Sequence, residues 1–256
     1  MDIIQSAILG LVEGVTEFLP ISSTGHLIVA SEWLGLPQTD SNKAFEVIIQ
    51  LSAILAVLTN YKERLHPKHM KLWIKVFISF LPIAAIGFLF KDEVKSLFTI
   101  TVVPIMFIVG GVIFLWMERY LKGREPTTHS LDEITYRQAI AIGIAQVFAL
   151  IPGTSRAGST IVGALLSGVN RTVSAEFSFL LALPVMVAAG GLELISNYQE
   201  FSHAQLTTLA VGFVVSYLSA WIVMKLFLAF LNRFTFNAFG IYRIIFGIAL
   251  LAWIYA

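Results

Sequence analysis

The stretch that decides the fold runs from Glu13 to His26 and reads EGVTEFLPISSTGH. Two carboxylates, several hydroxyls and an imidazole follow one another there, and a proline and a glycine interrupt the helix pattern. The apolar arms on either side, residues 3–19 and about 27–36, are shorter than the roughly 20 residues that cross a bilayer. Irregular backbone at membrane depth survives only inside protein or beside a wet cavity. We therefore expect a re-entrant helix pair with a polar tip.

The composition around this stretch is that of a membrane protein. Of 256 residues, 57% are hydrophobic and 13% charged, whereas soluble domains carry about 25% charged residues. The apolar runs are too long and too regular for barrel strands, so the fold class is an all-α integral membrane protein. The absence of cysteine excludes disulfides and thiolate metal sites. A net charge of +1 without aromatic-interleaved basic clusters argues against nucleic acid. The N-terminus lacks a basic, cleavable signal-peptide pattern.

A second, similar polar break occurs later in the chain. It reads IPGTSRAGST, from Ile151 to Thr160. Gly10 meets Gly143 and Ser22 meets Ser155 at an offset of 133, which favours an internal duplication over chance similarity between two apolar helices. A second re-entrant pair is predicted at 136–151 and 157–169. Six transmembrane helices are predicted at 44–60, 72–90, 101–120, 172–195, 204–227 and 237–256.

These elements form a single membrane domain, 1–256, made of two repeats at about 1–125 and 133–256. Each repeat has one re-entrant pair and three spans, and an odd number of crossings inverts the second repeat. The basic loop Lys62–Lys71 is placed in the cytoplasm, whereas Ser196–His203 has no Lys or Arg. Both termini are then predicted outside.

Glu13 and Glu17 are i,i+4 neighbours on one helix face. Two acids at membrane depth must share a proton, hold a cation or face an arginine. The alternative is that this arm ends near the interface and both carboxylates are merely solvated.

Ser22, Ser23 and Thr24 stand where a helix starts after Pro20. One of them is explained by capping alone, but free amides at a helix N-terminus also attract an anion such as phosphate. His26 follows Ser23 by three residues, and a serine with a histidine and a carboxylate is the minimal set for nucleophilic catalysis. The alternative is that His26 has only a structural role.

In the second break, Thr154 or Ser155 is expected to cap the next helix, which begins at Arg156. Arginine binds phosphate as a planar fork and stays charged. If the tips meet, two helix N-termini and Arg156 converge on one anion; alternatively, Arg156 only neutralises the glutamates. Two other polar pairs lie within spans. Glu46 and Gln50 could orient Arg156 or His26, and Arg243 with Glu193 could form a structural ion pair.

EGVTEFLPISSTGH together with PGTSRAGST resembles the undecaprenyl-diphosphate phosphatases, or bacitracin-resistance proteins, and the similarity extends over the whole chain. The resemblance implies a bacterial inner-membrane enzyme that hydrolyses a C55 polyprenyl diphosphate to the monophosphate and inorganic phosphate. This reaction recycles the lipid carrier of peptidoglycan synthesis. It also implies dependence on a divalent cation (Mg or Ca) and a site facing the periplasm. The expected partners are the polyprenyl diphosphate lipid and membrane lipids, and a homodimer is left open.

Motif by motif, the resemblance assigns Glu13 and Glu17 to the family's paired acids and Ser155–Arg156 to its PGxSR. One departure is Ala157, where the family usually has serine. Residues expected to bind the diphosphate are Ser22, Thr24, Gly25, Thr154, Ser155 and Arg156, and the SSTGH segment supplies Ser23 and His26.

Our hypothesis from the sequence is a phosphohydrolase in which Glu13 and Glu17 hold the cation and Ser23 or His26 attacks phosphorus, the other assisting. Water activated by a glutamate stays open. A transporter or flippase is the main competitor, because inverted repeats with broken helices are typical of transporters. A non-catalytic scaffold would not need buried acids.

Overall fold

The computed structural model describes residues 1–37, 39–97, 99, 101–196 and 206–255. These residues are almost entirely helical. The helices are α1 Ile3–Thr16, α2 Ser23–Trp33, α3 Asp40–Asn60, α4 Met70–Leu89, α5 Lys91–Ser96, α6 Val102–Leu121, α7 Tyr136–Gln146, α8 Arg156–Leu166, α9 Arg171–Ser196, α10 Leu206–Leu231 and α11 Asn237–Tyr255, with 3₁₀ turns at Lys62–Leu65, Pro67–His69 and Val147–Leu150.

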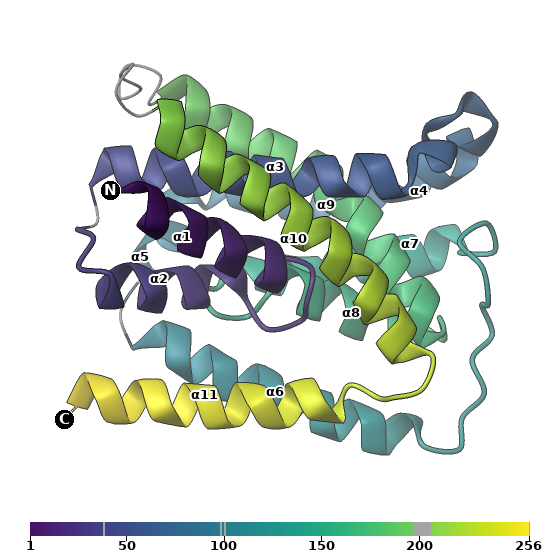
Figure 1. Ribbon diagram of the computed structural model, residues 1–256. Helices are drawn as coiled ribbons and strands as arrows, with labels where there is room; N and C mark the ends of the chain where they lie inside the picture. The colour runs from purple at the N-terminus through teal and green to yellow at the C-terminus, as the bar shows by residue number, and fades with distance from the viewer. Residues whose placement is uncertain (38, 98, 100, 197–205, 256) are drawn as a thin grey trace.

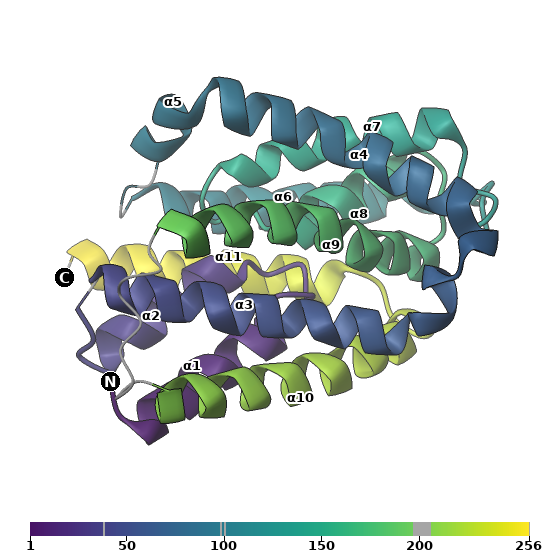
Figure 2. The same cartoon turned by 90° about the horizontal axis from the view of Figure 1, so that it is seen from above.

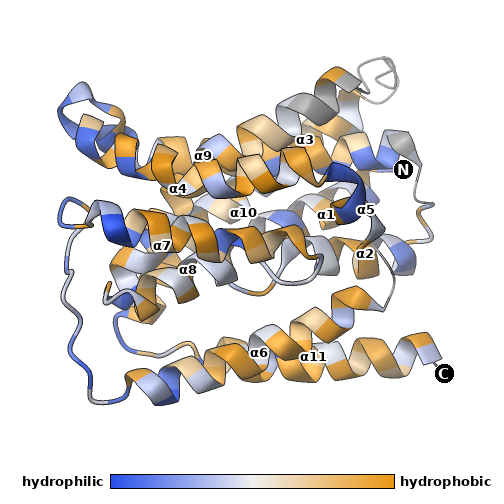
Figure 3. Cartoon of the chain, turned by 180° about the vertical axis from the view of Figure 1, so that it is seen from behind, coloured by the Kyte–Doolittle hydropathy of each residue, from blue (hydrophilic) through white to orange (hydrophobic). Residues whose placement is uncertain are grey.

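Six of these helices are long and apolar enough to cross a membrane. Their outward faces are largely hydrophobic (Figure 3), as expected of helices whose solvent is lipid. The all-α, multi-pass prediction is therefore confirmed. The six stretches are Ser41–Asn60, Pro67–Leu89, Val102–Leu121, Arg171–Gly191, Leu206–Leu231 and Asn237–Tyr255. Most of the 196–203 loop used for the charge argument lies outside the described residues.

The long helices run roughly along one direction, and both termini lie at the same end (Figures 1 and 2). Helix α6 lies beside α11, α1 beside α10, and α4 beside α7. The short helices α1 and α2 occupy the half of the molecule that holds the termini, and α7 and α8 occupy the other half (Figure 1). The two short helix pairs thus lie in opposite halves of the molecule (Figure 1).

Each short pair is interrupted earlier than the sequence pattern predicted. Helix α1 ends at Thr16 rather than at residue 19, because Pro20 has no N–H and its ring would clash with the carbonyl of residue 16. Helix α2 begins at Ser23 rather than near Leu27. The turn between the first two arms, residues 17–22 (the first tip), is therefore shifted toward the N-terminus, whereas the turn at residues 147–155 (the second tip) is longer than expected.

Glycines let the short helices approach their neighbours closely. A Cβ at Gly10 would lie 2.5 Å from the Gly212 carbonyl oxygen of α10, and a Cβ at Gly143 would lie 2.6 Å from the Ser79 carbonyl oxygen of α4. Close backbone approach through small residues is a common way to pack helices in lipid, where hydrophobic burial between helices supplies little.

The Gly143 contact can be tested by adding one methyl group. We expect Gly143→Ala to force α7 away from α4 and to destabilise the protein by about 1–3 kcal/mol, the usual cost of overpacking. Gly191→Ala, at a helical glycine with open space around it, is the matched control. Thermal unfolding in detergent measures both; an equal melting temperature for the two variants would contradict the close packing.

Candidate active site

The two tips meet in one small cleft of about 160 Å³. Helices α3 and α9 complete its wall with Gln50, Val185, Met186 and Ala189. The cleft is smaller than the roughly 300–1,000 Å³ pockets that enclose whole small ligands, so it admits a compact polar group. Its polar lining consists of Glu17, Ser22, Ser23, Thr24, Gln50, Ser155 and Arg156.

Glu17 is the centre of the cleft. Its Oε1 accepts a hydrogen bond from Arg156 Nη2 at 2.9 Å, and its Oε2 accepts one from Ser23 Oγ at 2.5 Å. Both partners of the ion pair are nearly buried, with side-chain exposures of 6% for Glu17 and 11% for Arg156. The two tips, 139 residues apart in sequence, are therefore joined by a charged contact.

Arg156 is held in place from its other side. Its Nη1 donates to the Ser178 carbonyl oxygen of α9 at 2.8 Å. The Ser178 hydroxyl in turn accepts a hydrogen bond from Thr160 on α8 at 2.7 Å. Ser178 lies outside both polar motifs, and Thr160 ends the second motif but was not predicted to be a site residue. Only the packing of α8 on α9 reveals the contacts of these two side chains.

The two serines that begin the second arms share an unusual backbone. Ser22 has φ 67° and Ser155 has φ 76°, and no other described non-glycine residue has a positive φ. Such conformations cost energy and concentrate at functional sites. The Ser155 hydroxyl accepts from Gly158 N at 3.0 Å, so the capping prediction is confirmed there. The Ser22 hydroxyl makes no capping bond, which leaves the first turn of α2 without that partner.

Glu13 lies beneath the cleft, fully buried, and neither of its carboxylate oxygens has a partner that donates a hydrogen bond. Glu17 follows Glu13 by one helical turn, so the two carboxyl groups lie on the same face of this segment. Gln146, which matches Glu13 at the repeat offset, is likewise buried with an unpartnered Oε1. A buried, unpartnered carboxylate beside a second one calls for a proton or a cation.

Glu13 and Glu17 fit a hard divalent cation, since carboxylate oxygens are the ligands that Mg²⁺ and Ca²⁺ prefer. Among the described residues no group of three or more acidic, histidine or cysteine side chains is arranged to hold a metal. The protein would therefore contribute at most these two carboxylates, and water and phosphate oxygens would complete the shell.

His26 is not brought to Ser23. Its Nδ1 lies 2.7 Å from the Ser22 carbonyl oxygen, which can only accept, so Nδ1 donates. Its Nε2 then accepts from the Tyr242 hydroxyl at 2.6 Å. The ring also stacks on Phe246 at 4.6 Å. Both nitrogens are engaged, and His26 does not line the cleft.

The other predicted residues divide between the cleft and its surroundings. Gln50 lines the cleft, whereas Glu46 accepts from Ser31 at 3.3 Å, and no hydrogen bond among the described residues joins it to Arg156 or His26. Gly25 packs against Phe107, where a Cβ would lie 2.4 Å from the ring. Thr154 does not line the cleft.

Arg243 donates to backbone carbonyls. The side chain of Glu193, its expected partner, lies outside the described residues. The charged guanidinium of Arg243 within an apolar span was the one sign in the sequence that this residue could belong to the site. The sequence by itself suggested only an ion pair for it.

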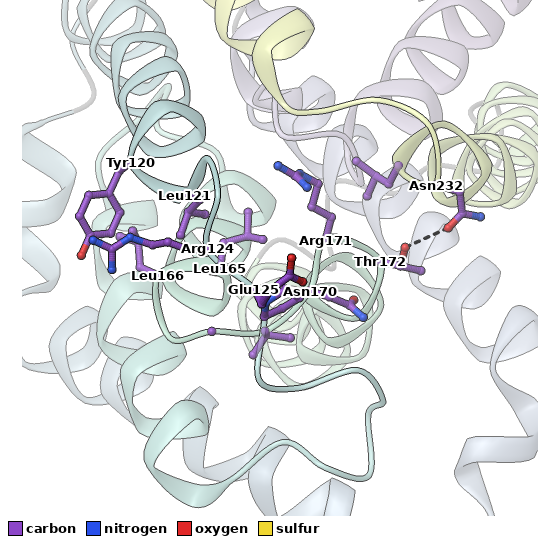
Figure 4. Close-up of a pocket in the computed structure, with 14 residues that line it drawn as sticks. Tyr120, Leu121, Arg124, Glu125, Leu165, Leu166, Asn170, Arg171, Thr172 and Asn232 are labelled. Carbon is purple, nitrogen blue, oxygen red and sulfur yellow. Dashed lines mark hydrogen bonds between the residues drawn. The ribbon is translucent and has the colours of Figure 1, made fainter.

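A larger pocket, of about 490 Å³, lies at the opposite end from the termini, where α6, α8 and α10 end and α9 begins (Figure 4). Its Arg171 is already paired with the buried Glu118, with Nη2 to Oε2 at 2.5 Å, and Thr172 donates to Asn232. It shares no lining residue with the cleft between the tips. Size alone therefore does not identify the reactive site.

Comparisons with known proteins agree on one family. The family model "Bacitracin resistance protein BacA" matches residues 6–249. The chain is 61% identical over 251 residues to "Undecaprenyl-diphosphatase 2" of Pseudoalteromonas translucida, with 98% of each chain covered. It is 59% identical to an "Undecaprenyl-diphosphatase" of Sulfurimonas denitrificans, again covering 98% of both chains, and 55% identical to one of Sulfurovum sp., covering 98% and 99%.

The ion pair across the tips can be tested through stability. Arg156→Met leaves Glu17 buried without its cation, and breaking a buried pair from one side costs about 3–5 kcal/mol. We expect the double variant Glu17→Gln with Arg156→Met to unfold at a higher temperature than Arg156→Met alone. Thermal unfolding in detergent measures the stability of each variant. A stability loss in the double variant equal to the sum of the losses in the two single variants would refute the coupling.

Proposed function

The chain belongs to the bacitracin resistance protein BacA family, and we propose that the cleft between the two tips is where it hydrolyses undecaprenyl diphosphate. The chain is a phosphoanhydride hydrolase that releases inorganic phosphate and leaves undecaprenyl phosphate, as its relatives' names and 46–61% identities support. Release of the monophosphate returns the lipid carrier to peptidoglycan synthesis and fits resistance to bacitracin.

The observation that carries this proposal is the chain of contacts Ser23–Glu17–Arg156. It places a hydroxyl, a carboxylate that can take its proton, and a cation that binds phosphate in one small cleft. Transport of an anion needs the arginine and the helix ends, but not a serine hydrogen-bonded to a carboxylate.

Arg156 is the main binding group for the diphosphate. Guanidinium has five N–H donors, and only Nη1 and Nη2 are engaged, with Ser178 and Glu17. The remaining donors, with the N-terminal amides of α2 and α8, would bind phosphate oxygens and stabilise the charge that spreads over the transferring phosphoryl group. Ser22, Thr24 and Ser155 add hydroxyls at the cleft wall.

Ser23 is the proposed nucleophile and Glu17 its base. The Ser23 hydroxyl attacks the terminal phosphorus while its proton passes to Glu17 Oε2. The bond from that phosphorus to the bridging oxygen breaks, and undecaprenyl phosphate leaves. Water then hydrolyses the phosphoserine and releases inorganic phosphate. His26 acts as a positioning residue, because its Nδ1 holds the Ser22 carbonyl in the positive-φ conformation that precedes Ser23.

A divalent cation, Mg or Ca, is proposed to bind between Glu13 and Glu17. Such an ion would neutralise phosphate charge and polarise a phosphoryl oxygen. Glu13 would otherwise remain a buried acid without a partner.

We propose that the two short helix pairs are re-entrant and that the chain is an inverted repeat, with halves at about 1–125 and 133–256. Matching details support this. Asp2 with Gln5 and Thr135 with Gln138 form capping boxes at the starts of α1 and α7, again 133 residues apart. The positive-φ serines Ser22 and Ser155 keep the same offset.

We propose that the chain lies in the bacterial inner membrane with the cleft open toward the periplasm, as the family resemblance implies. The charges of the loops support a periplasmic position for both termini. A homodimer stays a prediction.

The prenyl chain is too large for the cleft, and we propose that it lies in an apolar groove of about 520 Å³ beside the first tip. Leu19 and Ile21 belong to the same turn as Glu17 and Ser22, so the groove begins where the head group would bind. Helix α10 contributes Val223 and Leu226, and α11 contributes Ala238 and Phe239.

The catalytic assignment is tested by phosphate release from undecaprenyl diphosphate in detergent, with Mg, with Ca and with EDTA. We expect EDTA to abolish release and Ser23→Ala to lower kcat at least about 10³-fold, as removal of a nucleophile does. Glu17→Gln and Arg156→Ala should fall comparably, and His26→Ala less. Substantial activity in Ser23→Ala would favour water as nucleophile. No release by the folded wild type would favour a transporter.

The groove is tested by filling its far end. We expect Ala238→Trp to raise the KM for undecaprenyl diphosphate about tenfold, because the long chain loses apolar contact area. The KM for farnesyl diphosphate should change little, since a short chain does not reach α11 at that point. Ala252→Trp, exposed at the other end of α11, is the control. Equal effects on both substrates would place the chain elsewhere.

A further inference from the structure

Arg243 of α11 is the largest fully buried side chain in the described structure, with 0% exposure. A charged side chain within a membrane-spanning helix is costly and is retained where it has a task. None of the ion pairs among the described side chains includes Arg243. Its charge is instead satisfied by backbone.

The guanidinium donates to four carbonyl oxygens from three segments. Nη1 donates to Pro20 O of the first tip at 3.0 Å. Nη2 donates to Gly153 O of the second tip at 2.9 Å. Nη2 and Nε also donate to α6, at Met106 O (2.9 Å) and Phe107 O (3.3 Å). One side chain therefore ties both tips to each other and to a spanning helix.

The Pro20 and Gly153 carbonyls need a donor because their helices are broken. A helix interior pairs each carbonyl with an amide four residues on, and a broken helix leaves such groups orphaned in a medium without water. Gly153 also presses on α6, where a Cβ would lie 2.4 Å from Val103 O. The guanidinium is seated against Gly110, where a Cβ would lie 2.2 Å from Nη2.

We infer that Arg243 is the positioning residue that sets the distance between the two tips, and with it the geometry of Ser23, Glu17 and Arg156. The inference rests on the proposed function. Glu17 lies three residues before Pro20, and Arg156 lies three residues after Gly153. A shift of either anchored carbonyl therefore moves one partner of the ion pair relative to the other.

The neighbouring residue on α11 acts on the same tip. Tyr242 donates to His26, which holds the Ser22 carbonyl. Helix α11 thus holds the first tip at two points, Pro20 and Ser22. No residue of α11 lines the cleft itself. Misplacement of catalytic groups by about 1 Å can cost about 10²-fold in rate.

The experiment compares Arg243→Met, Arg243→Lys and Gly110→Ala with Arg233→Met, a matched control at an exposed arginine between α10 and α11. We expect kcat for undecaprenyl diphosphate to fall about 100-fold in both Arg243 variants, with KM within about threefold, because the binding groups remain while their alignment is lost. Lysine should not rescue, since one ammonium cannot match a guanidinium fork that reaches both tips. Arg233→Met should behave as wild type.

A distance measurement separates positioning from general stability. The chain has no cysteine, so spin labels at cysteines replacing Ile28 of α2 and Phe148 of the second tip, both exposed, report the distance between α2 and the second tip. We expect the distance distribution to broaden or shift in the Arg243 variants. If Arg243→Met does not fold, Gly110→Ala, which keeps the arginine but displaces it, should show the same change in smaller measure.

An unchanged distance with an unchanged kcat would overturn the inference, as would a loss of melting temperature in Arg243→Met with kcat retained. Inactive wild-type protein would instead defeat the proposed function, and the label distances would still test Arg243.

Discussion

The contact between Glu17 and Arg156 is the interaction on which the rest of the structure depends. It joins residues 139 positions apart at 2.9 Å, and both side chains are almost buried. Burying two charges costs several kcal/mol each unless geometry and further hydrogen bonds compensate. Ser23 supplies one such bond to Glu17 and the Ser178 carbonyl supplies another to Arg156. The pair is stable only because four segments converge on it.

The short helices make this convergence possible. Ending α1 at Thr16 and α7 at Gln146 brings irregular backbone to the middle of the molecule, where amides and carbonyls point at a cleft instead of closing helical turns. The same break that exposes amides for a phosphate also orphans carbonyls. Arg243 donates hydrogen bonds to Pro20 O and Gly153 O. The proposed binding of phosphate at the cleft and the hydrogen bonds from the Arg243 guanidinium behind it are two consequences of one broken backbone.

Much of this was readable from particular residues. The apolar spans, the Pro20 break and a cap at Thr154 or Ser155 follow from composition and turn chemistry. The meeting of the SSTG and GTSR tips was one arrangement that the charges allowed, and the structure decided it. The pairing of Ser23 with His26 did not follow, because spacing on one helix does not say which way an imidazole turns. His26 faces Tyr242, 216 positions away. Ser178, Thr160 and the role of Arg243 were equally out of reach, since Ser178 and Arg243 act through backbone carbonyls that contact other segments and Thr160 contacts the Ser178 hydroxyl on another helix.

The sequence by itself determined that the chain is a helical membrane protein with two polar breaks and that Glu17, Ser23 and Arg156 are candidates for chemistry. Local propensity, hydropathy and motif spacing act along the chain and can be read there. Only the tertiary structure decided that Ser23 donates to Glu17 rather than to His26, and that α11 anchors both tips. The α11 contacts join Arg243 to residues 90 and 223 positions away, and the Ser23–Glu17 contact, six positions apart, depends on the path of the backbone through the first tip. How helices pack sets this geometry, which no local pattern encodes.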